Sequence, residues 1–148
     1  MAMEYTLDRT AAGSSQATYD DAGKLLLRLT VAGLMLFHGI DKLGGVNGPM
    51  GALTRNGFPG FMVYGVYLGE IVAPLLLIAG FWTRPAALLY AFTVAFATWL
   101  VHSADYAMLK PNGAYGAELH VFYIACGLAV ALLGAGRYSV SKGRGKWD

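Results

Sequence analysis

Six ionisable side chains lie inside or beside the long apolar stretches of this 148-residue sequence. They are Arg28, His38, Glu70, His102, Glu118 and His120. Imidazole and carboxyl groups are the usual general acids and bases of proteins, so this set suits proton exchange. A charge inside a membrane helix costs about 2.5 to 3.5 kcal/mol on insertion scales and usually faces the protein interior. The set therefore predicts a polar pocket, with Glu70, His38 and His102 as candidate catalytic residues and Arg28, Glu118 and His120 as candidate ligand-binding residues.

Glu70 is the best-founded member of this set because its neighbours on both sides are apolar. Tyr67-Leu68-Gly69 precedes it and Ile71-Val72-Ala73 follows it. If a helix begins at Phe61, a rise of 1.5 Å per residue places Glu70 about 14 Å along it. A carboxyl group at that depth must be neutral, paired or beside a water-filled cavity.

Arg28 has two interpretations, and the sequence leaves both open. It lies a few residues inside the first apolar stretch, so its long side chain can reach the inner membrane surface. Alternatively, it pairs with Glu70, or with Glu118, across the protein interior.

The histidines do not form a local metal motif, because no two of them are three or four residues apart. The single cysteine, Cys126, cannot form a CxxC pair or a thiolate cluster by itself. We therefore predict no metal site and do not favour haem. His102 and Asp105 have the i, i+3 spacing of a hydrogen-bonded helical pair, which is an alternative to a site role.

The surrounding elements must be membrane helices. Apolar residues make up 56% of the chain and charged residues only 14%, against about 25% charged in typical soluble proteins. The net charge of +2 with scattered basic residues argues against nucleic-acid binding, so the predicted environment is a lipid bilayer. A span needs roughly 20 apolar residues in helical form. Four stretches qualify and predict an all-α, four-helix membrane bundle: 22–43, 61–81, 85–101 and 118–135.

Loop charges predict the orientation, since Lys and Arg are retained on the cytoplasmic side. Seven basic residues fall on one side and three on the other: Arg9, Lys24, Arg84, Arg137, Lys142, Arg144 and Lys146, against Lys42, Arg55 and Lys110. Both termini are therefore expected in the cytoplasm, with the pocket in the outer half of the bundle. We expect a mobile tail over 1–21, a membrane domain over 22–141 and a cytoplasmic tail over 142–148.

Small residues predict close helix packing. Gly65 and Gly69 have the small-xxx-small spacing that lets two helix backbones approach. Packing within the bundle is the favoured use of this face, and a homo-oligomer is the alternative.

Several short motifs, in order, resemble one known family, the DoxX family of small membrane proteins. The resemblance covers about residues 23–141 and is carried by Phe37-His38-Gly39-Ile40-Asp41-Lys42-Leu43, Gly57-Phe58-Pro59, Gly69-Glu70, Gly80-Phe81-Trp82-Thr83-Arg84, Glu118-Leu119 and Gly134-Ala135-Gly136-Arg137-Tyr138-Ser139. It implies a four-helix fold in a bacterial-type plasma (inner) membrane and a link to oxidoreduction. The family is similar to the membrane subunit of thiosulfate:quinone oxidoreductase. The family's polar positions fall here on Arg28, His38, Glu70, His102 and Glu118.

Two functions follow as hypotheses, and the sequence leaves open whether the chain is an enzyme. The first is a membrane subunit of an oxidoreductase system, quinone-linked, in which the pocket exchanges the protons of a quinone. The sequence has no flavin or dinucleotide glycine motif, so electrons would come from a soluble or membrane redox partner, a thiol or a sulfur compound. The alternative is a non-catalytic protein that binds a lipid, a small ligand or a partner protein in the same pocket.

Overall fold

The computed structural model describes the backbone from Ala2 to Asp148 and the side chains from Ser15 onward. Within these residues the chain is helical and contains no β-strand, as the sequence predicts. The elements are α1 (Ala2–Asp41), α2 (Asn47–Arg55), α3 (Gly65–Tyr67), a π-helical turn (Leu68–Val72), α4 (Ala73–Ala79), α5 (Thr83–His102) and α6 (Glu118–Leu133), with 3-10 turns at Lys42–Gly44, Gly60–Tyr64 and Ser103–Ala107.

Three helical stretches of the described chain are long and apolar enough to cross a bilayer. They are Ser15–Gly44, Gly60–Ala79 and Thr83–Ala107, and Glu118–Leu133 is a shorter apolar helix. Each overlaps one of the four stretches expected from the sequence. Large apolar side chains face outward along them, among them Phe37, Phe92 and Leu132. An apolar exterior is what lipid contact requires, and the membrane class is confirmed.

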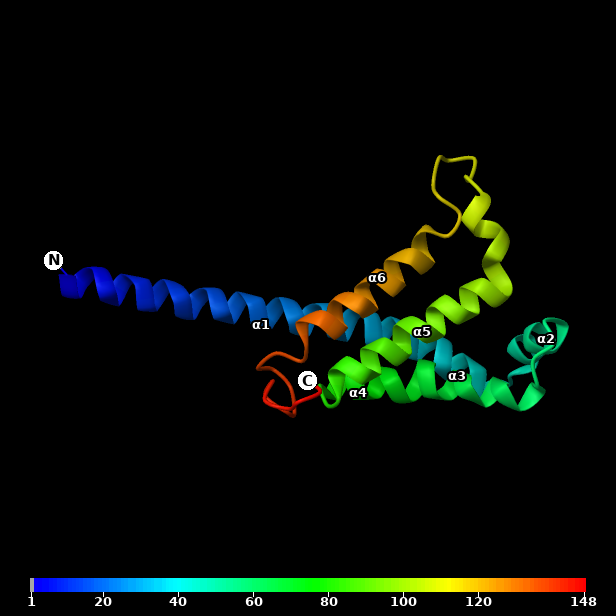
Figure 1. Ribbon diagram of the computed structural model, residues 1–148, viewed down its shortest axis with the longest axis horizontal. Coiled ribbons are helices and arrows are strands. Elements are labelled where there is room, and N and C mark those ends of the chain that lie inside the picture. Colours follow the sequence, from blue (N-terminus) through cyan, green and yellow to red (C-terminus); the bar gives the residue numbers. More distant parts are fainter. Residues whose placement is uncertain (1) are drawn as a thin grey trace.

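The spans pack side by side (Figure 1), with α5 against α6, α4 against both α1 and α5, and α6 against α1. Small residues let these helices approach closely, because alanines make up much of the core beside Leu77 and Tyr90. The short helix α2 lies at the end remote from the C-terminus (Figure 1).

The segment 1–21, expected to be a tail, is helical from Ala2 onward, because α1 continues through it. Figure 1 shows this part of α1 projecting beyond the other helices. Its mobility stays a prediction, and the side chains before Ser15 lie outside the described residues.

The second span is irregular around Glu70. Pro74 has no N–H, so the α-helical bond that residue 74 would donate to the Glu70 carbonyl cannot form. The backbone widens there into the π-helical turn, in which the Ala73 N–H bonds the Leu68 carbonyl. Such single π turns within helices occur frequently at functional sites.

Two glycines allow neighbouring helices to close on this turn. A Cβ at Gly39 of α1 would collide with the Glu70 carbonyl oxygen and with Ile71. A Cβ at Gly69 would collide with Thr93 of α5. The backbone on both sides of Glu70 is therefore held between α1 and α5, which fixes where the carboxyl group points.

Candidate functional site: an ion pair at a π-helical turn

Glu70 is paired with Lys42, at the end of the first span. The Lys42 Nζ atom lies 2.6 Å from Glu70 Oε2, and the two side chains are 20% and 8% exposed. The Tyr67 hydroxyl donates a hydrogen bond of 3.1 Å to the Lys42 carbonyl, which joins the two spans a second time. A short bond between an ammonium and a carboxylate is charge-assisted and strong.

The pairing has different consequences for its two members. Lys42 follows α1 at a helix end, so its flexible stem can bring the ammonium group to water. Glu70 is buried within the second span and has no such route. Removal of its partner would leave a buried carboxyl group unpaired, which is the more expensive arrangement.

His102 and His120 form a second polar cluster, at the α5–α6 connection. Their ring centroids are 4.7 Å apart. His102 Nδ1 lies 3.0 Å from Asp105 Oδ2, the i, i+3 pair expected from the sequence, and these two side chains are 46% and 35% exposed. Among the described residues, the buried His120 Nδ1 atom has no hydrogen-bond partner. The cluster can bind or release a proton, but it is far more accessible than Glu70.

Arg28 lies elsewhere, and among the described residues it pairs with neither Glu70 nor Glu118, which was one of the two arrangements that the sequence leaves open. The side chain is 1% exposed. Its Nη1 and Nη2 atoms each donate a 2.7 Å hydrogen bond, to the carbonyls of Ala135 and Tyr138. Two guanidinium nitrogens are therefore bound by backbone of the C-terminal segment, while the buried Nε atom has no hydrogen-bond partner among the described residues.

Arg84 acts in the same way and was not singled out as a site residue. Its Nη1 atom bonds the Ala131 and Leu132 carbonyls at 2.9 and 3.1 Å, at the end of α6. Its backbone N–H bonds the Trp147 carbonyl at 2.9 Å. Residues 135–148, which we call the C-terminal strap, are thus tied to the α4–α5 turn.

His38 and Glu118 are exposed side chains, so the six predicted site residues do not form one cluster of direct contacts. Among the described side chains, no hydrogen bond or ion pair links Glu70 to any histidine. The described residues also contain no group of three or more His, Cys, Asp or Glu side chains arranged to hold a metal ion. The structure brings together His102 with His120, and Glu70 with Lys42.

Lys42 is the functional candidate that the sequence interpretation passed over. It is the last charge of the Phe37–Leu43 motif, and from the sequence it is counted among the outer charges and as a possible partner of His38, not of Glu70. The available signal was a basic residue at the end of one span facing a buried acid in the next. Which basic residue reaches Glu70, Lys42 or Arg28, depends on how the two helices are placed along each other. The sequence of either span alone does not specify this placement.

The chain is similar to known membrane proteins of one family. The DoxX family model matches residues 23–103. A Haemophilus influenzae "Uncharacterized protein" is 34% identical over 113 residues, which are 74% of this chain and 81% of that protein. The Escherichia coli "Inner membrane protein YqjF" is 31% identical over 128 residues, 83% of this chain and 92% of that one. The chain belongs to the DoxX family and is a multi-pass membrane protein.

One further relative has a name that refers to chemistry. "Putative oxidoreductase CatD" of Bacillus subtilis is 31% identical over 74 residues, which are 50% of this chain and 55% of that protein. No solved structure matches the chain.

Proposed function

We propose that this chain is the membrane subunit of a quinone-linked oxidoreductase system in the bacterial inner membrane. In this proposal the four apolar helices form a bundle with both termini in the cytoplasm. Lys42 and Glu70 then lie in its outer half and exchange protons with a quinone head group. The Lys42–Glu70 pair on the π-helical turn carries the proposal, because it is a costly, well-fixed pair of proton-exchanging groups.

The chemistry of the pair fits a quinone. Full reduction of a quinone takes two electrons and two protons, the protons going to its carbonyl oxygens. An ammonium group donates hydrogen bonds to such oxygens, and a carboxyl group delivers or accepts the protons. Lys42 therefore supplies orientation and positive charge, while Glu70 supplies proton transfer. Lys42, at the helix end, re-protonates the pair from water.

The electrons must come from outside this chain. The sequence has one cysteine and no flavin or dinucleotide motif, so the donor is a redox partner, a thiol or a sulfur compound such as thiosulfate. The resemblance to the membrane subunit of thiosulfate:quinone oxidoreductase supports this assignment, and the name of the Bacillus subtilis relative supports oxidoreduction in general. The donor is oxidised as the quinone takes up its two electrons.

The test is a reductase assay on the purified chain in lipid nanodiscs. Reduction of a short-chain quinone is followed by its ultraviolet absorbance, with thiosulfate, sulfite, sulfide or a dithiol as donor, with and without membrane extract as a partner source. The wild type should reduce quinone with at least one donor. Glu70→Gln should lower the turnover at least tenfold, because the amide cannot transfer the proton.

Two variants complete this assay. Asp20→Asn makes the same carboxylate-to-amide change at an exposed position of α1 and should keep wild-type turnover. His102→Ala should have a smaller effect than Glu70→Gln, because His102 is accessible and makes no bond to Glu70. Equal turnover in Glu70→Gln and the wild type, or no reduction with any donor, leaves the binding-protein alternative as the better account.

A further inference from the structure

The C-terminal strap combines exposed cations with exposed apolar and aromatic side chains. Val140 is 72% exposed, Trp147 is 52% exposed and Tyr138 is 43% exposed. Lys142 and Arg144 are exposed, and among the described residues neither side chain has a hydrogen bond or an ion pair. The Lys146 ammonium lies 5.3 Å from the centre of the Trp147 ring. This composition is typical of segments at a membrane interface.

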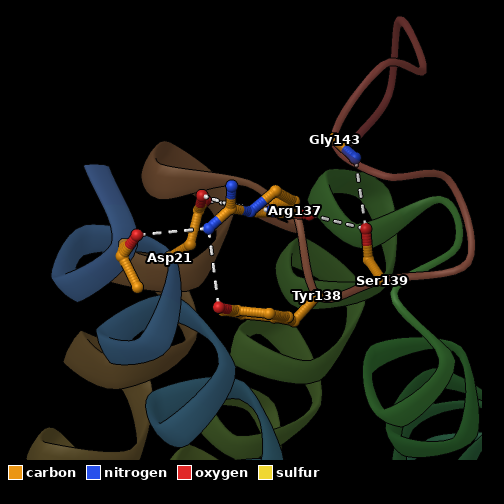
Figure 2. Close-up of polar contacts among 7 residues, drawn as sticks. Asp21, Arg137, Tyr138, Ser139 and Gly143 are labelled. Atoms are coloured by element: carbon orange, nitrogen blue, oxygen red, sulfur yellow. Dashed lines mark hydrogen bonds and ion pairs between the residues drawn. The ribbon is translucent and has the colours of Figure 1, made fainter. Parts of the chain in front are cut away.

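The strap is held in place by the helices. Arg28 and Arg84 bond its backbone, as described above, and the Val140 N–H bonds the Ala79 carbonyl at 2.9 Å. Figure 2 shows the start of the strap: Arg137 lies against Asp21 of α1, and the Gly143 N–H bonds the Ser139 hydroxyl at 3.1 Å. The exposed cations therefore lie on a segment whose backbone is tied to the ends of the helices.

We propose that the strap is a binding surface for anionic phospholipid. Lys142, Arg144 and Lys146 contact headgroup phosphates, while Val140 and Trp147 enter the boundary between headgroups and acyl chains. Charge complementarity favours this occupant, because each basic residue near an anionic membrane surface adds attraction. The apolar side chains favour a lipid over an acidic soluble protein. The inference rests on the membrane placement of the chain and is independent of the quinone-linked activity.

The experiment measures which lipids stay bound to the full-length chain. The protein is reconstituted in phosphatidylcholine containing phosphatidylglycerol, extracted in mild detergent and examined by native mass spectrometry. The wild type should retain phosphatidylglycerol in preference to phosphatidylcholine. Lys142→Gln with Arg144→Gln should lower that preference about fivefold per removed charge, and added salt should lower the wild-type preference, because salt screens exposed charges.

A matched double variant removes two charges from the opposite end. Arg55→Gln with Lys110→Gln changes the net charge equally, and both side chains are exposed. It should keep the wild-type preference for phosphatidylglycerol. Both double variants should also keep the wild-type unfolding temperature, because none of the four side chains has a described polar partner.

Three results would overturn the inference. One is an equal loss of phosphatidylglycerol in the two double variants, and another is no loss in either. The third is recruitment of a polyglutamate peptide by the strap in phosphatidylcholine alone, without any lipid preference, which would assign the surface to an acidic protein. Quinone reduction is absent from all these readouts, so failure here leaves the proposed function standing, and the reverse also holds.

Discussion

The two ends of the membrane spans satisfy their buried charges in different ways. Near the strap, Arg28 donates hydrogen bonds to two backbone carbonyls, which tie the C-terminal segment to the helices. Near the opposite end, Glu70 is paired with the side chain of Lys42. Carbonyls cannot exchange protons with a guanidinium, whereas a carboxylate and an ammonium can. The comparison separates a buried charge that binds backbone from a pair of ionisable side chains, to which we assign the proposed chemistry.

The largest effect should come from removing the fold-holding charge. Arg28→Met leaves the Ala135 and Tyr138 carbonyls without donors, at about 1 to 3 kcal/mol for each unsatisfied group. We expect a large fall in unfolding temperature, measured by scanning fluorimetry in detergent. The control is Arg137→Met, which removes a largely exposed guanidinium from its ion pair with Asp21 and should cost at most about 1 kcal/mol. Equal stability of the two variants would contradict a structural role for Arg28.

The Lys42–Glu70 pair should show an asymmetry. Lys42→Met leaves the buried carboxyl group unpaired and should cost about 2 kcal/mol of stability, less than the full cost for a completely buried pair because Lys42 is partly exposed. Glu70→Gln should cost less, since the freed ammonium can move to water. Chemical unfolding of both variants checks this order, and the reverse order would mean that Lys42 is the trapped member.

The contact between α1 and the π-helical turn gives a matched glycine pair. Gly39→Ala should destabilise by about 1 to 3 kcal/mol, because the added methyl group overlaps the Glu70 backbone. Gly33→Ala, on the same helix, meets no atom within 4 Å and should be neutral or stabilising, by up to about 1 kcal/mol. Thermal unfolding of the two proteins distinguishes close packing from a general effect of glycine in α1. Similar changes in unfolding temperature for both variants would mean that the close contact between Gly39 and the Glu70 backbone does not stabilise the site.

The apolar runs of the sequence predict most of this fold, but they do not predict the partners of its buried charged side chains. The four runs indicate the spans, and insertion cost points to Arg28 and Glu70 as the residues that need explanation. Arg28 bonds backbone carbonyls more than a hundred residues away. Every residue has such a carbonyl, so the residue types do not reveal these acceptors. Pro74, four residues after Glu70, is a local signal for the missing helical bond. To predict Lys42 as the partner of Glu70, one must know how α1 packs on the second span, and the sequence of neither span specifies this packing.

The smallest effect should come from Glu118, which the family resemblance marks but the structure leaves exposed. Glu118→Gln should change stability by no more than about 0.5 kcal/mol, as is usual for surface positions. Quinone reductase turnover should stay at the wild-type level. A tenfold loss of turnover in this variant would place Glu118 in the functional site and would blur the contrast between the buried pair and the exposed residues.

The central claim is that Glu70 serves ligand chemistry and Arg28 serves the fold. The most direct test measures quinone reductase turnover and unfolding temperature on the same samples of wild type and Glu70→Gln. We predict that Glu70→Gln loses at least tenfold in turnover and unfolds close to the wild-type temperature. Wild-type turnover in Glu70→Gln, or a loss of turnover only together with a large fall in unfolding temperature, would contradict the claim.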